Sequence, residues 1–257
     1  MDYADYIRQI SFRLLQPETP RPTGFRALNK LARKAGLHLE MWMTRLPEDQ
    51  EKMQRRLRRV CQLKRCSTFA IGAMINRGVG RLRPDQVYLN LGVGAGFSLF
   101  AGMAGHRRKQ CIGVDTFTSK PSSKERFLRR FDRWKSPRHE FHELEFRRYL
   151  SDVHRGPIGF CVCDGLRVYQ DQYDALRLVE PHLTEGGVVL LDDTNWVDVN
   201  RAVADFMAHS PFEYRILLDV HTPRSGHPTF WNGVMVLERR ERKAVIVPFA
   251  TRERRAA

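Results

Sequence analysis

The sequence predicts an α/β fold, in which a helical extension precedes a Rossmann-like, mostly parallel sheet of seven strands with a terminal antiparallel hairpin. The first observation is an apolar strand, Val87–Leu91, which runs directly into a glycine-rich turn and a helix from about Ser98. The second is that later apolar strands end in carboxylates, namely Asp115 and the pair Asp192 and Asp193. Because ligands of open α/β sheets bind at the carboxyl ends of the strands, these residues place the chemistry along one sheet edge.

From residue 87 onward, apolar runs alternate with segments of helical periodicity. Strands are predicted over 87–91, 111–114, 140–144, 158–162 and 188–191. The helices that follow them are predicted from about residue 98 and over 122–134, 145–153, 169–179 and 196–209. Two last strands, 214–220 and 231–237, have no helix between them, which predicts an antiparallel hairpin at one edge of the sheet.

The N-terminal third is predicted to be helical. Helices are expected over 2–16, ended by Pro17, over 25–35, from Pro47 onward, and over 67–76. The chain therefore divides into a basic helical extension (1–86) that caps the site or mediates oligomerisation, a catalytic domain (87–238) and a basic tail (239–257).

The net charge of +15 resides entirely in the flanks. Residues 1–86 carry 18 Lys and Arg against 8 Asp and Glu, residues 239–257 carry 7 against 2, and residues 87–238 carry 19 against 19. The flanks are either solvated basic faces or docking surfaces for an acidic membrane surface or another polyanion.

The termini and the cysteines bear on location. The chain opens with Asp2 and Asp5 and shows neither an apolar leader nor a run long enough to span a membrane. Its 5 cysteines include no C-x-x-C pair, so reduced, buried thiols in a cytoplasmic protein are expected.

The spacing of the glycine turn indicates the nucleotide. Dinucleotide enzymes use G-x-G-x-x-G, whereas here Phe97 occupies the third glycine position and the turn reads G-x-G-x-G. Asp115 lies 19 residues beyond Gly96, a distance that suits a carboxylate gripping a ribose. This combination favours S-adenosylmethionine (SAM), which has no pyrophosphate to bind, although glycines also serve ordinary tight turns.

Residues from about 87 to 238 resemble a class I SAM-dependent methyltransferase, and within that class the macrocin O-methyltransferase-like group, which also contains cephalosporin hydroxylase. The matching motifs are N-L-G-V-G-A-G-F-S from Asn90, G-V-D from Gly113, D-G from Asp164 followed by Tyr169, L-T-E-G-G from Leu183, and L-D-D from Leu191. The resemblance implies that the cofactor is held by Asn90, Gly92, Gly94, Gly96, Ser98, Asp115 and Asp164.

The resemblance also implies that Asp164, Asp192 and Asp193 bind a divalent cation, usually Mg²⁺. Carboxylate oxygens at the ends of two adjacent strands suit such a hard cation, which would orient a substrate hydroxyl and lower its pKa. The alternative is that these aspartates cap the segments that follow them.

Two positions depart from the pattern of the family. Where some members have a histidine that acts as the general base, this chain has Arg167, which stays protonated and cannot accept a proton. Where members tend to have an acid near the amino end of the cofactor, this chain has Asn90. Arg167 is instead expected to bind an acidic substrate or the carboxylate of the cofactor.

The loop between the last two strands follows a strand parallel to the others, so it is expected at the same sheet edge. His221 and His227 in this loop are the candidate bases, with His221 nearer the strand end. An apolar or sugar-stacking wall, or simply core packing, is expected from Trp196, Phe230 and Trp231. His142 and Glu145, near the end of the third strand, are expected to border the adenine.

The predicted function is SAM-dependent, metal-assisted O-methylation of a small molecule or glycan precursor, with Asp164, Arg167 and His221 as the candidate catalytic residues. Two alternatives stay open: an RNA methyltransferase that uses the basic flanks, and an inactive methyltransferase-like scaffold. A hydroxylase activity has no support from particular residues.

Overall fold

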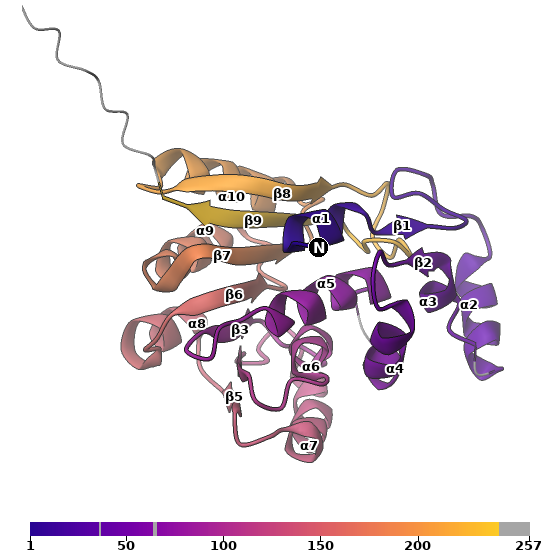
Figure 1. The fold of residues 1–257 in the computed structure, drawn as a ribbon, viewed down its shortest axis with the longest axis horizontal. Coiled ribbons are helices and arrows are strands. Elements are labelled where there is room, and N and C mark those ends of the chain that lie inside the picture. Colours follow the sequence, from indigo (N-terminus) through magenta and orange to yellow (C-terminus); the bar gives the residue numbers. More distant parts are fainter. Residues whose placement is uncertain (36, 64–65, 242–257) are drawn as a thin grey trace, which may run out of the picture.

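The computed structural model describes residues 1–35, 37–63 and 66–241. A seven-stranded sheet lies at its centre (Figure 1). The strands lie in the order β5-β4-β3-β6-β7-β9-β8, and β9 is antiparallel to both of its neighbours. Their bounds are β3 Val87–Leu91, β4 Gln110–Val114, β5 His139–His142, β6 Ile158–Cys163, β7 Leu183–Asp192, β8 Glu213–Val220 and β9 Val234–Arg240. The predicted sheet with its terminal hairpin is confirmed.

Helices cover both faces of this sheet. Those of the extension are α1 Tyr3–Arg8, α2 Phe25–Lys34, α3 Leu39–Met43, α4 Gln50–Cys61 and α5 Phe69–Gly80. Those that follow strands are α6 Phe97–Met103, α7 Lys124–Trp134, α8 Phe146–Arg148, α9 Tyr169–Val179 and α10 Val197–His209. Short turns precede α7 (η1, Pro121–Ser123), follow α8 (η2, Tyr149–Val153) and follow α9 (η3, Glu180–His182).

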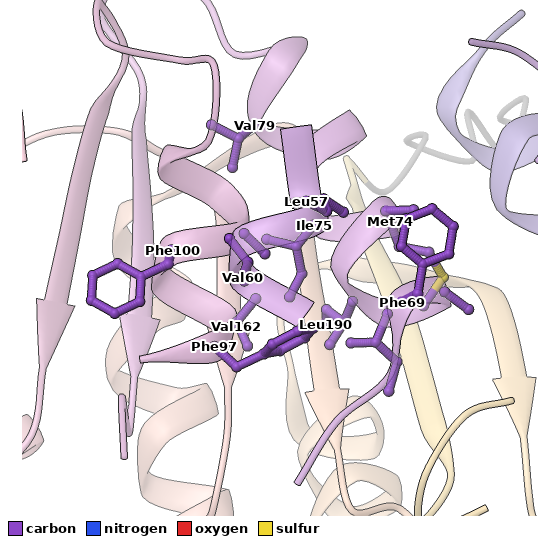
Figure 2. Close-up of a cluster of buried hydrophobic side chains, with 14 of the residues drawn as sticks. Leu57, Val60, Phe69, Met74, Ile75, Val79, Phe97, Phe100, Val162 and Leu190 are labelled. Carbon is purple, nitrogen blue, oxygen red and sulfur yellow. The ribbon is translucent and has the colours of Figure 1, made fainter. Parts of the chain in front are cut away.

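The extension is part of the core of the protein. Leu57 and Val60 of α4 and Phe69 of α5 lie in one buried cluster with Val162 of β6 and Leu190 of β7 (Figure 2). The opposite face of the sheet packs against α9 and α10 through a second buried cluster. Since side chains alternate across a strand, the extension supplies the apolar cover that one sheet face needs.

The N-terminal elements differ from their predicted bounds. The helix expected over 2–16 ends at Arg8, because Ser11–Phe12 (β1) pairs with Thr44–Arg45 (β2) instead. The helix expected from Pro47 begins at Gln50, and α3 was not predicted. These choices depend on pairing between segments distant in sequence, which helical periodicity does not report.

His154 predicts a pH-dependent stability. His154 is 1% exposed, and its ring nitrogens contact the Tyr149 hydroxyl (3.2 Å) and the Gly156 carbonyl (3.1 Å). Because the ring is buried, this site favours the neutral form of the imidazole. Burial, with the nearby His182, lowers the pKa of His154 from 6.5 to about 4. Between pH 6.5 and pH 4 the unfolded chain therefore binds a proton at His154 that the folded chain does not bind. The contribution of the neutral His154 to the free energy of unfolding is complete above about pH 6.5 and is lost as the pH falls.

Thermal unfolding at pH 7 and pH 5 tests this expectation. The His154→Gln variant, which keeps a donor and an acceptor, should lose roughly 4 °C less between the two pH values than the native chain. Equal losses in the two proteins would show that His154 does not supply the pH dependence.

Candidate active site

The glycine turn after β3 has a backbone that only glycine adopts readily. Gly92, Gly94 and Gly96 have φ angles of 78°, 49° and 97°, and Gly96 directly precedes α6. A Cβ atom on Gly92 would lie 1.9 Å from the carbonyl oxygen of Asp164, so the turn packs closely against the end of β6.

Asp115 at the end of β4 holds this turn in place. Its Oδ2 accepts hydrogen bonds from the amides of Val93 (2.9 Å) and Gly94 (2.8 Å), and its Oδ1 accepts one from the amide of Phe117 (2.7 Å). The structure thus brings the predicted ribose acid and the glycine turn together. It also gives Asp115 a second role, because the same carboxylate orders two loops of the site.

A cavity of about 690 Å³ lies at this edge of the sheet. Its lining comes from the glycine turn (Gly92, Val93, Gly94, Ala95, Phe97), the β4 end and following segment (Val114, Asp115, Thr116, Thr118, Ser119, Lys120, Ser122, Ser123, Arg126, Arg130), residues 144–147, Asp164, Gly165, Leu166, Asp171, and Cys66 and Ser67 of the extension. Glu145 lies in this lining as expected, whereas His142 does not.

Three basic residues of the lining were missed by the sequence analysis. Lys120, Arg126 and Arg130 follow β4, and none of them forms a salt bridge in the described part of the chain, although the charge of Lys120 acts on Asp164. Their signal in the sequence is positional, since a segment that follows a parallel strand begins at the ligand-binding edge.

Asp164 lines the cavity next to Ser98, whose hydroxyl donates to its Oδ2 at 2.8 Å. Burial, opposed by the Ser98 hydrogen bond and aided by the charge of Asp193, raises the pKa of Asp164 to about 6. Two residues expected at the cofactor are therefore in direct contact.

Asp192 and Asp193 lie beside Asp164 and are 4% and 3% exposed. Burial and the charges of the two other aspartates raise the pKa of Asp192 well above its ordinary value. Arg167 donates from Nε to Oδ2 of Asp193 at 2.6 Å. The charges of the three aspartates thus act on one another, and Arg167 pairs with one of them, a pairing that the sequence did not indicate.

Asn90 is fully buried in β3. Its Nδ2 donates to the carbonyls of Leu91 (3.4 Å) and Gly92 (3.2 Å), while its Oδ1 is buried without a partner in the described residues. Asn90 does not itself line the cavity, and its Oδ1 is the atom left to accept a hydrogen bond from a donor such as an ammonium group.

The two candidate histidine bases lie in different surroundings. His221 is exposed, and its Nε2 is 3.4 Å from Oδ1 of Asp219. His227 is fully buried and contacts the Thr229 hydroxyl (2.7 Å) and the Thr19 carbonyl (2.9 Å). His227 therefore ties the last loop to the extension, and neither histidine lines the cavity.

The three aromatic residues predicted to form a wall have different surroundings. Phe230 is 3% exposed and packs edge-on against Phe12, with ring centroids 5.3 Å apart. Trp231 forms a backbone bridge with His227 in the same loop. Trp196 is 49% exposed, and its ring centroid lies 5.9 Å from the guanidinium carbon of Arg167, which bonds Asp193.

The described part of the chain contains no group of three or more His, Cys, Asp or Glu residues arranged to hold a metal ion. None of its helices has the length and apolar character that crossing a bilayer requires.

Residues 89–194 match a sequence family described as a methyltransferase domain. Among solved structures, the chain is similar to a TDP-rhamnose 3'-O-methyltransferase of calicheamicin biosynthesis, with TM-score 0.54, 18% identity, and coverage of 86% of this chain and 96% of that one. It is also similar to the SAH-bound methyltransferase of Podospora anserina (TM-score 0.53, 13% identity, 87% and 100% covered). The SAM-bound O-methyltransferase TomG of Streptomyces achromogenes gives TM-score 0.50, 15% identity, and 75% and 91% covered.

The match over residues 89–194 identifies a methyltransferase domain, and the fold around it is that of the class I SAM-dependent methyltransferases, which together indicate an enzyme of this kind. At these identities the solved structures show the shared fold alone. None of the curated proteins matches the chain in sequence.

Cys66 offers a probe of ligand binding. It is exposed and lines the cavity, whereas the other four cysteines, at 61, 111, 161 and 163, are buried. We expect one thiol to react rapidly with a disulfide reagent, and saturating S-adenosylhomocysteine (SAH) to slow it at least about tenfold, because thiol reactivity requires access. A Cys66→Ser variant should lose the fast phase. An unchanged rate at saturating SAH would show that the cofactor does not approach this part of the cavity.

Proposed function

We propose that the enzyme transfers the methyl group of SAM to a hydroxyl of a small-molecule or sugar acceptor. The observation that carries the proposal is the cavity of about 690 Å³, which has the size of a small-molecule site. The similar solved structures support it, since two of them are O-methyltransferases by name and one acts on TDP-rhamnose.

In this proposal the cofactor lies against the glycine turn. Asp115 holds the ribose, Glu145 and its neighbours border the adenine, and the unpaired Oδ1 of Asn90 accepts from the amino group. Methyl transfer is an in-line displacement: the acceptor oxygen bonds to the methyl carbon as the carbon–sulfur bond breaks and SAH leaves. The candidate catalytic residues stay Asp164, Arg167 and His221.

The basic residues of the cavity favour an acceptor that carries a negative group. Lys120, Arg126 and Arg130 form no salt bridge in the described residues, so a phosphate or carboxylate could bind there without displacing an ion pair. A sugar carried on a nucleoside diphosphate combines such a group with free hydroxyls.

Metal assistance by Mg²⁺ stays a prediction of the resemblance, and the side chains present fit it poorly. The Asp193 carboxylate already accepts from Arg167 (2.6 Å) and from Nδ2 of Asn232 (2.9 Å). A cation would have to displace one of them.

The extension contributes Cys66 and Ser67 to the cavity lining, which supports its proposed role as a cap. Self-association through its helices, and contact of the basic flanks with an acidic surface, stay predictions. Of the tail, residues 242–257 lie outside the described residues.

A methyl-transfer assay with SAM labelled in the methyl group tests the proposal. Calorimetric titration with SAH, with and without Mg²⁺, first establishes that the cofactor site is formed. Acceptors are nucleoside-diphosphate sugars, the same sugars without phosphate, and a structured RNA. We expect label in the phosphorylated sugars above all. Label in RNA alone would favour the RNA methyltransferase, and SAH binding with no transfer to any acceptor would favour the scaffold.

A further inference from the structure

An arginine occupies the acidic edge where the resemblance implies a cation. Nε of Arg167 donates to Oδ2 of Asp193 at 2.6 Å, and Nδ2 of Asn232 donates to Oδ1 of the same carboxylate at 2.9 Å. The Asp193 side chain is 4% exposed and that of Arg167 is 41% exposed. Both carboxylate oxygens of Asp193 therefore accept hydrogen bonds from side chains of the protein.

The other two carboxylates are also partly engaged. Oδ2 of Asp164 accepts from the Ser98 hydroxyl (2.8 Å), and Oδ1 of Asp192 accepts from the amide of Asp193 (2.9 Å). A Mg²⁺ ion needs oxygen ligands in near-octahedral geometry at about 2.1 Å. A fixed guanidinium charge bonded to one of those ligands opposes its binding, so the donor set does not fit a divalent cation.

The rest of the Arg167 guanidinium is free to bind a ligand. Of its five N–H donors, only Nε–H is bonded within the described part of the chain. Trp196 lies beside it, with the ring centroid 5.9 Å from Cζ, and is 49% exposed. Arg167 and Trp196 follow β6 and β7 at the carboxyl edge of the sheet, and Arg167 is the residue after Leu166 of the cavity lining.

We propose that Arg167 takes the place that the resemblance assigns to a divalent cation, holding Asp193 with Nε and presenting its Nη groups to the acceptor oxygen. The inference rests on the proposed methyl transfer. The acceptor oxygen forms a bond to the methyl carbon, the carbon–sulfur electron pair remains on SAH, and the hydroxyl proton passes to Asp164, whose Oδ1 is unbonded in the described residues. Arg167 stays protonated and stabilises the charge that develops on the oxygen.

Metal binding tests the inference independently of activity. Mn²⁺ is titrated into the SAH-loaded protein and followed by electron paramagnetic resonance. We expect no binding at submillimolar Mn²⁺ for the native chain, and at least about tenfold tighter binding for Arg167→Gln, which removes the opposing charge. Adding Asp193→Asn to that variant should abolish the gain.

Kinetics and a control complete the test. Where an acceptor is methylated, EDTA should leave the native rate unchanged, and Arg167→Gln should lower kcat by about 100-fold with the KM for SAM unaltered. Arg201→Gln removes the same charge from an arginine that lies over the Tyr169 ring, away from the acidic group, and should behave as the native chain. SAH affinity within twofold of native shows that each variant is folded.

Two results overturn the inference: submillimolar Mn²⁺ binding by the native chain, or no gain of Mn²⁺ binding in Arg167→Gln. Failure of the proposed function looks different, because then no acceptor is methylated by the native enzyme while the Mn²⁺ titrations keep their meaning.

Discussion

Replacing Asp115 by alanine is expected to weaken SAH binding by about 100-fold, equivalent to about 2.7 kcal/mol. The carboxylate accepts three backbone hydrogen bonds, from Val93, Gly94 and Phe117, so its loss frees both the glycine turn and the following segment. The variant also removes the partner proposed for the ribose hydroxyls. Each hydrogen bond to a charged group contributes about 1.5–3 kcal/mol, which makes the combined loss large even if the loops relax.

Calorimetric titration with SAH measures this loss. Asp115→Asn keeps one acceptor oxygen and should fall between the native and alanine proteins. Asp132→Ala is the matched control, because Asp132 of α7 has a side chain that is 68% exposed and pairs with Lys135 of the same segment. Native affinity in Asp115→Ala would mean that neither the ribose contact nor the order of the turn depends on this carboxylate.

The Gly92→Ala variant is expected to be strongly destabilised and to lose SAH binding. Its φ of +78° costs a residue with a Cβ about 1–2 kcal/mol, and the new Cβ would lie 1.9 Å from the carbonyl oxygen of Asp164. Since that oxygen belongs to the backbone, the turn or the end of β6 must move. Either movement changes the lining of the cavity, because Gly92 and Asp164 both belong to it.

Gly94 provides the matched control for this substitution. Its φ is +49°, but a Cβ there would meet nothing within 4 Å, so Gly94→Ala should show the backbone cost alone. Denaturant unfolding of both variants measures the difference in stability. Equal destabilisation of the two would show that close approach to Asp164 is not what requires glycine at position 92.

The catalytic sheet was predictable because its signals are local. Each parallel strand is a short apolar run bounded by turn residues, and the strands β3 and β6 and the helix α9 were placed to within a residue. The start of β7 was not, because residues 183–187 read as a turn yet Leu183 pairs with Ile158 of β6. The prediction followed the local residue types of this segment, which are typical of a turn, and these do not report its pairing with β6.

The ligand-binding edge was also predictable in outline. Glycines after β3 and acids after β4, β6 and β7 must meet at one edge once the strands are parallel. The contact between Ser98 and Asp164 follows from that arrangement, although they are far apart in the chain.

The sequence by itself determined the fold class, the position of the glycine turn and the side chains available at the carboxyl edge. These follow from residue periodicity and from glycine's unique access to positive φ, which are properties of short segments. Only the tertiary structure decided that Arg167 bonds Asp193, that His227 ties the last loop to Thr19, and that Lys120 reaches the cavity. Which side chains pair depends on distances between loops that are far apart in the sequence and close in space, and no local sequence pattern encodes those distances.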